Sequence, residues 1–369
     1  MNLSKLFGLG RGKTKHFSAW QVELTTRCSL MCRMCIRQGC EGWHTSDMGI
    51  DNFRKLTPYF KYVESVVLEG WGESLLHQNL ADAVGLVKAS GAQAGFVASG
   101  TGLDRGKIHE IINAGIDFVG FSLAGATSRT HNSIRVNSDL ESLLGNIQHM
   151  VEIKKSKRLK KPRLHIVYLM LKENISEVSP LLKLANDTGV NEVVLINLVH
   201  VTNEWQEEQR VFSCESSNPP PNYEGLLMEA EQEAAKLKIK LRRPNLSPVE
   251  VAVCEEDPLR NLYISAEGEV SPCVYLHPPA NSPFKRIFCG QESQIEKVSF
   301  GNVFGEPFES IWNNKAYIKF RERFGARQRR FEKKMLSNLL NMESFRGLEI
   351  VPLPSPPVQC LTCHKMLGL

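Results

Sequence analysis

The most informative stretch of this chain is Thr25-Thr26-Arg27-Cys28-Ser29-Leu30-Met31-Cys32-Arg33-Met34-Cys35. Its three cysteines have the spacing C-x3-C-x2-C, and they follow residues 17–24, whose alternating apolar pattern predicts a first β-strand. A loop of this kind can turn three sulfurs toward one soft metal centre. Three thiolates are one fewer than a closed zinc site or a four-thiolate iron–sulfur cluster needs. Either the fourth ligand comes from elsewhere in the chain, or one iron stays open for a small molecule.

Length and charge limit the class of protein to which this chain can belong. The chain has 369 residues, a net charge of +5 and a pI of about 8.6, so it can form one large domain with an appendage and is only mildly basic. No segment approaches the ~18 consecutive apolar residues of a membrane span, and residues 1–16 lack a signal-peptide core. We therefore expect a cytoplasmic protein with no membrane partner. Ten cysteines in such a protein are expected to be metal ligands or reduced thiols rather than disulfides.

The N-terminal residues 1–16 are predicted to form a flexible tail. Residues 8–14 look like a phosphate-binding loop, but Phe7 stands where that pattern requires glycine, and no strand precedes it. Two basic runs, at residues 154–161 and 327–334, are predicted to be solvated faces, with an acidic peptide or protein as an alternative use. Neither run has the interleaved aromatic residues of a nucleic-acid site, so no nucleic-acid partner is expected.

Strand-like and helical segments alternate along the first half of the chain. Strands are predicted at residues 17–24, 63–68, 94–98, 118–123, 164–171 and 192–198, and helices at 50–60, 77–89, 103–114, 140–155 and 175–188. This alternation predicts an α/β fold with a parallel sheet, right-handed crossovers and burial on both faces of the sheet. Chemistry in such sheets gathers at the carboxyl ends of the strands, where the cysteine loop, residues 69–73, Ser99 and Ser122 all fall.

The second half of the chain has a different character. Residues 216–221 predict a loop or boundary, 224–238 a helix, 262–273 a hairpin that turns at 267–268, and 307–324 a helical run. A proline-rich lead at 352–357 precedes Cys360-Leu361-Thr362-Cys363-His364. We therefore divide the chain into the tail (1–16), an α/β domain (17–222), a linking helix and strand (223–246) and a C-terminal domain (247–369).

The cysteine spacing at the end of a first strand resembles the signature of the radical SAM superfamily. The resemblance implies a partial (β/α)6 TIM-like barrel and a [4Fe-4S] cluster held by Cys28, Cys32 and Cys35. It also implies that S-adenosylmethionine (SAM) chelates the open iron through its amino and carboxylate groups. The residue before the third cysteine is usually aromatic in the family. Met34 stands there in this chain, and its polarizable thioether is expected to contact the adenine.

The resemblance assigns further SAM contacts. A Gly-Gly-Glu turn after the second strand binds the methionyl amino group in the family; here Trp71 replaces the first of those glycines, while Gly72 and Glu73 match. In the fourth-strand segment, a serine and a downstream arginine reach the ribose and the carboxylate, and arginine suits a carboxylate because it donates two parallel hydrogen bonds. The expected SAM contacts are Met34, Gly70, Trp71, Gly72, Glu73, Ser122 and Arg135. An ordinary turn and a surface arginine are the alternatives.

The distal cysteines resemble a second family pattern. Cys254, Gly268 and Cys273 have the spacing C-x13-G-x4-C, which resembles the opening of the SPASM and twitch extensions of radical SAM enzymes. With Cys360 and Cys363 they supply four thiolates, enough for one auxiliary [4Fe-4S] cluster but not for the seven cysteines and two clusters of a full SPASM domain. We therefore expect a twitch-like domain. Cys289 is an alternative to Cys254 as the fourth ligand.

Three alternatives remain open for the cysteines. The four distal thiols suit a structural zinc site, and residues 360–364 match the c-type haem motif C-x-x-C-H, which would require export. A non-catalytic zinc-binding interaction protein is the hypothesis from another class. Cys40 and Cys214 are expected to be small buried residues.

The activity implied by the resemblance is reductive cleavage of SAM to a 5′-deoxyadenosyl radical, which abstracts hydrogen from a substrate. The expected partners are SAM, a reduced flavodoxin- or ferredoxin-type electron donor, and a peptide, protein or small-molecule substrate. Residues 356–368 look similar to the tails of radical SAM maturases associated with tungsten-cofactor oxidoreductases. Maturation of a protein, peptide or cofactor is therefore our leading expectation, and small-molecule dehydrogenation is the alternative.

Overall fold

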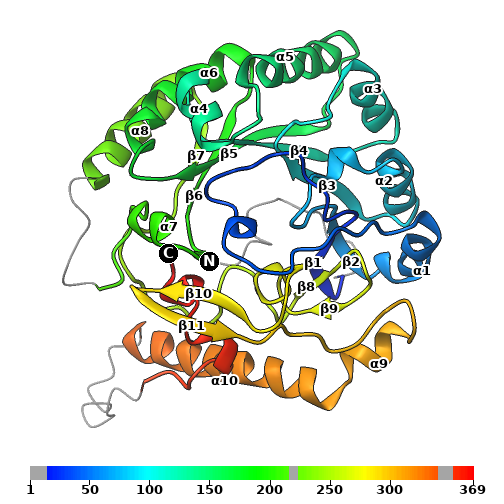
Figure 1. Cartoon of the computed structure of the whole chain (residues 1–369), viewed down its shortest axis with the longest axis vertical. Coiled ribbons are helices and arrows are strands. Elements are labelled where there is room, and N and C mark those ends of the chain that lie inside the picture. The colour runs from blue at the N-terminus through cyan, green and yellow to red at the C-terminus, as the bar shows by residue number, and fades with distance from the viewer. Residues whose placement is uncertain (1–14, 216–222, 340–351) are drawn as a thin grey trace.

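A single sheet of nine strands organises the chain (Figure 1). The computed structural model describes residues 15–215, 223–339 and 352–369, so most of the predicted tail and the loop predicted at 216–221 lie outside the described residues. The strand order is β7-β6-β5-β4-β3-β2-β1-β8-β9. The bounds are β1 Phe17–Val22, β2 Val63–Val67, β3 Gln93–Ala98, β4 Phe118–Leu123, β5 Arg163–Met170, β6 Glu192–Asn197, β7 Lys240–Arg242, β8 Asn261–Ile264 and β9 Val270–Ser271. All neighbours from β7 to β8 pair in parallel, and only β9 runs antiparallel.

Helices surround the curved sheet on its outer side (Figure 1). They are α1 Ile50–Phe60, α2 Leu80–Ala89, α3 Arg105–Asn113, α4 Ser128–Ile134, α5 Leu140–Ser156, α6 Val178–Thr188, α7 Glu204–Glu208 and α8 Tyr223–Leu237. Aspartates begin two of them: Asp104 accepts from the N–H of Lys107, and Asp139 accepts from the N–H of Ser142. The predicted partial barrel, with six strands alternating with helices, is confirmed.

The first strand shows how the sheet separates its two faces. Trp20 is fully buried on the outer face, where its ring packs against Phe60 and Phe308 at centroid distances of 6.0 and 4.6 Å. Ala19 and Gln21 point the other way and line a cavity. Burial on both faces is therefore incomplete at β1 and β2, because part of the inner face is left open for a ligand.

The C-terminal region continues the same sheet. The predicted hairpin is confirmed as β8 and β9, and β8 also pairs in parallel with β1, with Ala19 opposite Asn261 and Val22 opposite Ile264. A second hairpin, β10 Phe284–Phe288 and β11 Gln291–Ile295, was not predicted. It is followed by α9 Phe308–Trp312 and α10 Lys315–Leu339. The single helical run expected at 307–324 is therefore wrong, because Asn314 interrupts it and its side chain accepts from the N–H of Ala316.

None of the helices in the described ranges is both long enough and apolar enough to cross a membrane.

The chain enters the fold at Lys15, whose ammonium donates to the carbonyls of Val63 and Gly91, each at 2.8 Å.

Candidate active site

The cysteine loop lies inside the ring of strands, at the carboxyl end of β1 (Figure 1). Its backbone pairs with the segment after α4: the Met31 N–H donates to Val136 at 3.0 Å and the Arg33 N–H to Ile134 at 2.9 Å. These bonds place Arg135 beside the loop. Arg135 Nε is buried without a hydrogen-bond partner among the described residues. A buried guanidinium nitrogen left in this way is suited to an anionic ligand such as a carboxylate.

The three thiols of the loop influence one another. Burial, together with the neighbouring Cys32 and Cys28, raises the pKa of Cys35 to about 11. Burial also raises the pKa of Cys28. Cys28 and Cys35 therefore hold their protons more tightly than an exposed thiol does, and metal binding must displace those protons. Three soft donors within electrostatic reach of one another in a partly buried loop fit an iron–sulfur cluster that leaves one iron open.

Two residues that the sequence analysis missed hold the carbonyl groups of this loop. The guanidinium of Arg37 donates to the carbonyls of Cys28 and Leu30. The Gln206 amide, fully buried on α7, donates to the carbonyls of Arg33 and Cys35 at 3.3 and 3.2 Å. Each side chain thus donates to backbone carbonyls of the cysteine loop. Arg37 could have been suspected because it lies two residues after the last cysteine, whereas no sequence signal marks Gln206.

The glycines of the turn at residues 70–73 allow it to pack against the cysteine loop. A Cβ at Gly72 would lie 2.1 Å from the carbonyl oxygen of Thr25, and a Cβ at Gly70 would lie 2.3 Å from Glu23 Oε1. The Glu73 N–H donates to the carbonyl of Arg27 at 2.8 Å. The two glycines therefore serve a close approach of protein to protein, which fixes the turn beside the three thiols.

Glu73 is held by Ser99, the third-strand residue that was given no role. Glu73 is 4% exposed, and its Oε2 accepts from the Ser99 N–H at 2.7 Å and from the Ser99 hydroxyl. Burial raises the pKa of Glu73, while these bonds and the charge of Arg135 lower it. The carboxylate therefore lies between Ser99 and the loop that carries Arg135.

Ser122 and Met34 are two further residues that the resemblance assigned to SAM. Ser122 is the penultimate residue of β4, near the carboxyl end of that strand. Met34 is 8% exposed and belongs to an apolar cluster that also holds Leu30 and Ala124. The structure thus brings the cysteine loop, the 70–73 turn, Ser122 and Arg135 to one end of the sheet. Their contacts with SAM stay predictions.

The four distal thiols form a second group, built from three segments of chain. Burial raises the pKa of Cys254 and of Cys273, and each of these two thiols is raised further by the charges of Cys360 and Cys363. Burial also raises the pKa of Cys360 to about 12. Four buried or half-buried thiols within electrostatic reach of one another fit the donor set of an auxiliary iron–sulfur cluster.

Two buried arginines join these three segments. Arg286, 2% exposed, donates to the carbonyls of Gln359 at 3.0 Å and Tyr275 at 3.2 Å. Arg327, 8% exposed, donates to the carbonyls of Ala252 and Val251 at 2.9 and 2.8 Å, and to that of Pro354. The prediction that Arg327 belongs to a solvated basic face is therefore wrong: it points inward and ties the segment before Cys254 to the C-terminal segment.

The four distal sulfurs are not arranged in this structure as a bound zinc ion would hold them. Zinc–sulfur bonds of ~2.3 Å in a tetrahedral site place sulfurs about 3.8 Å apart. Among the described residues, only Cys214, Cys289 and His364 bring three such ligand atoms within 4.8 Å of one another. The distal four are therefore more widely spaced than a zinc site requires.

Cys289 is bonded in this structure to a residue outside the distal site, because it forms a disulfide with Cys214. The alternative in which Cys289 replaces Cys254 as the fourth ligand stays a prediction. The disulfide contradicts the expectations that disulfides are absent and that Cys214 is an unbonded buried residue. The two cysteines lie 75 residues apart in loops that meet only in the folded chain, so no local sequence pattern predicts their pairing.

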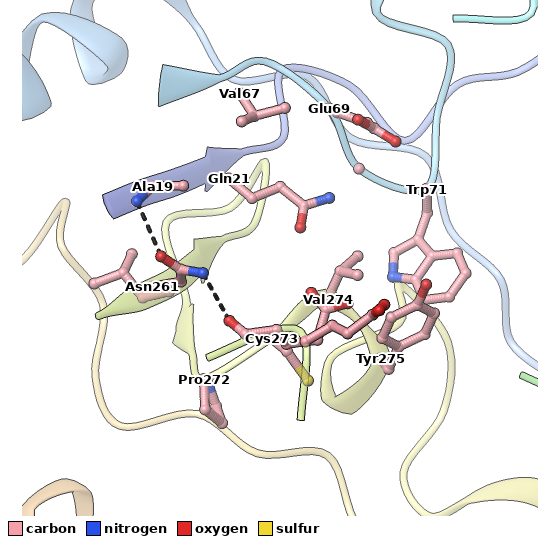
Figure 2. A pocket seen from close by; sticks show the side chains of 14 residues that line it. Ala19, Gln21, Val67, Glu69, Trp71, Asn261, Pro272, Cys273, Val274 and Tyr275 are labelled. Carbon is pink, nitrogen blue, oxygen red and sulfur yellow. Dashed lines mark hydrogen bonds between the residues drawn. The ribbon is translucent and has the colours of Figure 1, made fainter. Parts of the chain in front are cut away.

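A cavity of about 420 Å³ lies on the inner face of β1, β2 and β8 (Figure 2). Residues of both halves of the chain line it, namely Ala19, Gln21, Val67, Glu69, Gly70, Trp71, Glu255, Glu256, Asn261, Leu262, Pro272, Cys273, Val274 and Tyr275. The Gln21 amide points into the cavity, and Trp71 and Tyr275 lie side by side at one end (Figure 2). The cavity therefore has the 70–73 turn on one side and a distal thiol on the other, and its volume is in the range of small-ligand sites.

The charges around this cavity are largely compensated. The Lys365 ammonium pairs with Glu256 at 2.9 Å and with Glu255 at 3.5 Å. Burial, reinforced by the charge of Glu256, raises the pKa of Glu69 to about 8. Glu69 therefore carries a proton over much of the neutral pH range and presents an uncharged carboxylic acid to the cavity.

His200 extends the aromatic end of the cavity. It is 6% exposed, and its ring centroid lies 5.6 Å from those of Trp71 and Tyr275. Its Nε2 is buried with no hydrogen-bond partner in the described part of the chain, and burial lowers its pKa well below the usual value. The sequence analysis missed His200, since a lone histidine after a strand carries no motif.

Comparison with known proteins gives matches over both halves of the chain. A sequence profile of the Radical SAM superfamily matches residues 22–185, and a profile of the SPASM iron-sulfur cluster-binding domain matches residues 254–363. A curated relative is the tungsten-containing aldehyde ferredoxin oxidoreductase cofactor-modifying protein of Pyrococcus furiosus. It is 26% identical over 305 residues, which cover 81% of this chain and 82% of that protein.

Solved structures share the fold at low sequence identity. The crystal structure of Streptococcus suis SuiB bound to S-adenosylmethionine has a TM-score of 0.58 and 11% identity, covering 96% of this chain and 72% of that chain. Native anSMEcpe with bound AdoMet and Cp18Cys peptide has a TM-score of 0.56 and 12% identity, covering 83% of each chain.

Proposed function

Because this chain is a radical SAM enzyme with a SPASM-type iron–sulfur domain, we propose that it modifies a peptide, a protein or an enzyme cofactor during maturation. The observation that carries this proposal is the cavity of Figure 2, which is lined by both Trp71 and Cys273. A substrate in this cavity lies between the turn beside the first cysteine loop and a thiol of the second cysteine site.

We assign Cys28, Cys32 and Cys35 as ligands of the SAM-binding [4Fe-4S] cluster. When bound there, the cluster and SAM supply a 5′-deoxyadenosyl radical by reductive cleavage. The chain's own part is to orient SAM and to exclude water. Arg135, with its unpartnered buried Nε, receives the carboxylate, and the 70–73 turn with Glu73 receives the ammonium. Met34, Gly70, Trp71, Gly72 and Ser122 complete the SAM contacts.

We assign Cys254, Cys273, Cys360 and Cys363 as the ligands of one auxiliary [4Fe-4S] cluster in the C-terminal domain (247–369). The two family matches, which lie on either side of residue 247, support this division of the chain. The positive charges of Arg286 and Arg327 lower the pKa of Cys360 against the effect of burial. The two arginines therefore offset part of the negative charge that four thiolates bring into a buried site.

Two residues that line the cavity, Glu69 and Tyr275, and the adjoining His200 handle the substrate. Glu69 holds a proton on its carboxyl group and can take up or release it near pH 8. His200 offers a neutral, unpartnered Nε2. The phenol of Tyr275 lies against Trp71, whose ring closes the wall toward the SAM site. These uncharged groups favour a substrate with neutral hydrogen-bonding groups, because an ionic group would find no free counter-charge there.

The maturation proposal is supported by the relative that acts as a cofactor-modifying protein for a tungsten-containing oxidoreductase. A peptide bound in a structure of the same fold supports the same substrate class. The alternative, dehydrogenation of a free small molecule, is favoured by the limited cavity volume of about 420 Å³. In either case a reduced flavodoxin or ferredoxin in the cytoplasm is the proposed electron donor.

The test is an anaerobic assay of the full chain with both clusters reconstituted. We expect dithionite-dependent 5′-deoxyadenosine, and its rate should rise several-fold when the apo form of a tungsten or molybdenum oxidoreductase is added. The matched control is Cys32→Ala protein, which should form none. Absence of 5′-deoxyadenosine from the wild-type chain contradicts the SAM chemistry, whereas an unchanged rate with the added protein contradicts only its role in maturation.

A further inference from the structure

A third group of metal-binding side chains lies outside both cysteine sites. Cys214, Cys289 and His364 place their ligand atoms within 4.8 Å of one another. They come from the segment after α7, from the turn between β10 and β11, and from the residue that follows Cys363. In this structure the two sulfurs are bonded to each other.

His364 is oriented as a metal ligand would be. It is fully buried, and its Nδ1 lies 3.0 Å from the carbonyl oxygen of Val199, so Nδ1 carries the proton and donates it. Nε2 then carries the lone pair, and its contact is the Cys289 N–H at a long 3.3 Å. The rings of Phe212 and Phe288, at centroid distances of 5.1 and 4.9 Å, fix the imidazole in place. A neutral imidazole whose other nitrogen donates to a carbonyl is the usual form of a zinc-bound histidine.

The surroundings of the two cysteines point in the same direction. Cys289 and Gly290 form the hairpin turn with φ values of +51° and +79°, which is the geometry that favours Asn-Gly. Cys289 occupies the first position of this turn, where a positive φ disfavours cysteine. The contacts of its sulfur with Cys214 and His364 are what a cysteine adds at this position. Arg210, held by Glu207, donates to Cys214 Sγ at 3.3 Å. When Cys214 acts as a metal ligand, this cation lies beside its negatively charged sulfur.

We propose that Cys214, Cys289 and His364 form a redox-dependent zinc site that replaces the disulfide when the protein is reduced. A dithiol reductant supplies two electrons and two protons, which cleave the S–S bond to two thiols while the reductant becomes a disulfide. Zn²⁺ then displaces the two thiol protons and is bound by two thiolates and His364 Nε2, with water as the fourth ligand.

Both states tie the segment after α7 to the turn between β10 and β11, and the zinc state adds the segment that carries His364. The hairpin β10–β11 stays attached to the barrel segment that follows β6, next to the Cys360–Cys363 pair. A radical SAM enzyme works with a strongly reducing electron donor, and a disulfide is reduced under such conditions. The zinc state therefore preserves the attachment when the enzyme is active.

The test measures zinc bound by the full chain with both iron–sulfur clusters in place. As purified in air, protease digestion and mass spectrometry should find a Cys214–Cys289 crosslink. After reduction by a dithiol and anaerobic desalting, the protein should bind one equivalent of Zn²⁺, at least ten times more than before reduction. Cys214→Ser and Cys289→Asn proteins should lose this zinc, and the asparagine keeps the turn because it tolerates positive φ. Cys40→Ser is the matched control and should keep it.

A second measurement uses only the wild-type chain, in case the variants do not fold. Zn²⁺ should slow alkylation of Cys214 and Cys289 in the reduced holoenzyme at least tenfold and leave the alkylation of Cys40 unchanged. Zinc binding that is equal before and after reduction would overturn the proposal. So would zinc retained by both cysteine variants, or alkylation rates that Zn²⁺ does not alter.

Discussion

The cysteine loop at residues 28–35 and the distal cysteine site assemble their thiols in opposite ways. The loop takes three thiols from one short stretch, and its carbonyls are satisfied by Arg37 and Gln206. The distal site takes four thiols from three segments between residues 254 and 363, and Arg286 and Arg327 tie those segments together. A local site is set mainly by its own turn, whereas an assembled site depends on long-range packing. We therefore expect the two sites to respond differently to substitution.

The largest effect is expected from Cys32→Ala, which removes a ligand from the local site. SAM-dependent 5′-deoxyadenosine should fall below detection, because no other thiol of the loop can replace the lost ligand. Iron should fall from about eight to about four atoms per chain, since the assembled site keeps its own four-iron cluster. Iron analysis and product chromatography measure the two effects. Complete loss of iron would mean that the two sites depend on each other.

The second effect is expected from the pair Cys360→Ala and Cys363→Ala. Iron should again fall by about half, but SAM cleavage without substrate should persist within a few-fold of the wild-type rate. The physical reason is that the first loop is anchored to the barrel, through the bonds from the Met31 N–H to Val136 and from the Arg33 N–H to Ile134. The same iron and 5′-deoxyadenosine assays report the result. Loss of SAM cleavage together with the auxiliary iron would contradict the independence of the loop.

A third effect, on stability, is expected from Arg286→Met. This change removes two charge-assisted bonds to buried carbonyls and should lower the free energy of unfolding by about 3 kcal/mol. Urea denaturation followed by circular dichroism measures it. Arg286→Lys is the control, because it keeps the charge but loses the forked geometry, and it should recover only part of the loss. An unchanged free energy in the methionine variant would show that the arginine does not join the segments.

The smallest effect concerns Glu23, which joins the 70–73 turn of the barrel to the β8–β9 hairpin of the C-terminal region. It is 1% exposed and accepts from the Trp71 N–H, from the Tyr263 hydroxyl at 2.7 Å and from the Ala266 N–H at 3.3 Å. Burial raises its pKa from 4.5 to about 7. Between these pH values the folded protein holds a proton that the unfolded chain has released, so the free energy of unfolding falls as pH rises from about 4.5 to about 7.

The size of this fall is at most about 3 kcal/mol for the one group. Glu23→Gln removes the titration, so the difference in unfolding free energy between pH 4.5 and pH 8 should be smaller in the variant by up to that amount. Urea titrations of both proteins at the two pH values give the comparison. Equal pH dependence in the two proteins would show that Glu23 does not hold the proton.

The sequence predicted the barrel closely where periodicity is local. Helix α1 and strand β4 occupy the predicted residues 50–60 and 118–123, because each pattern is complete within one segment. The cysteine motifs likewise predicted two groups of thiols that the structure brings together. The parallel pairing of β8 with β1 could not be predicted, since the two strands lie far apart in the chain and pair through backbone atoms.

The missed residues of the candidate site share one property. Gln206, His200 and Arg286 act through contacts with segments distant in sequence, and each residue type is common at ordinary positions. The disulfide between Cys214 and Cys289 is another case, because its two partners lie 75 residues apart. Such contacts depend on tertiary structure and leave no periodic signal.

The pairing of β8 with β1 has a practical consequence for building chimeras. Transplanting a C-terminal module from a relative by cutting at residue 247 would strip β1 of its neighbour and expose a row of unpaired N–H and C=O groups, which invites aggregation. A hybrid that also matches the Ala19–Asn261 register, and keeps the Asn261 amide that accepts from the Ala19 N–H at 3.0 Å, avoids this exposed edge. In engineering terms, the smallest exchangeable unit is the module together with the strand on which it docks.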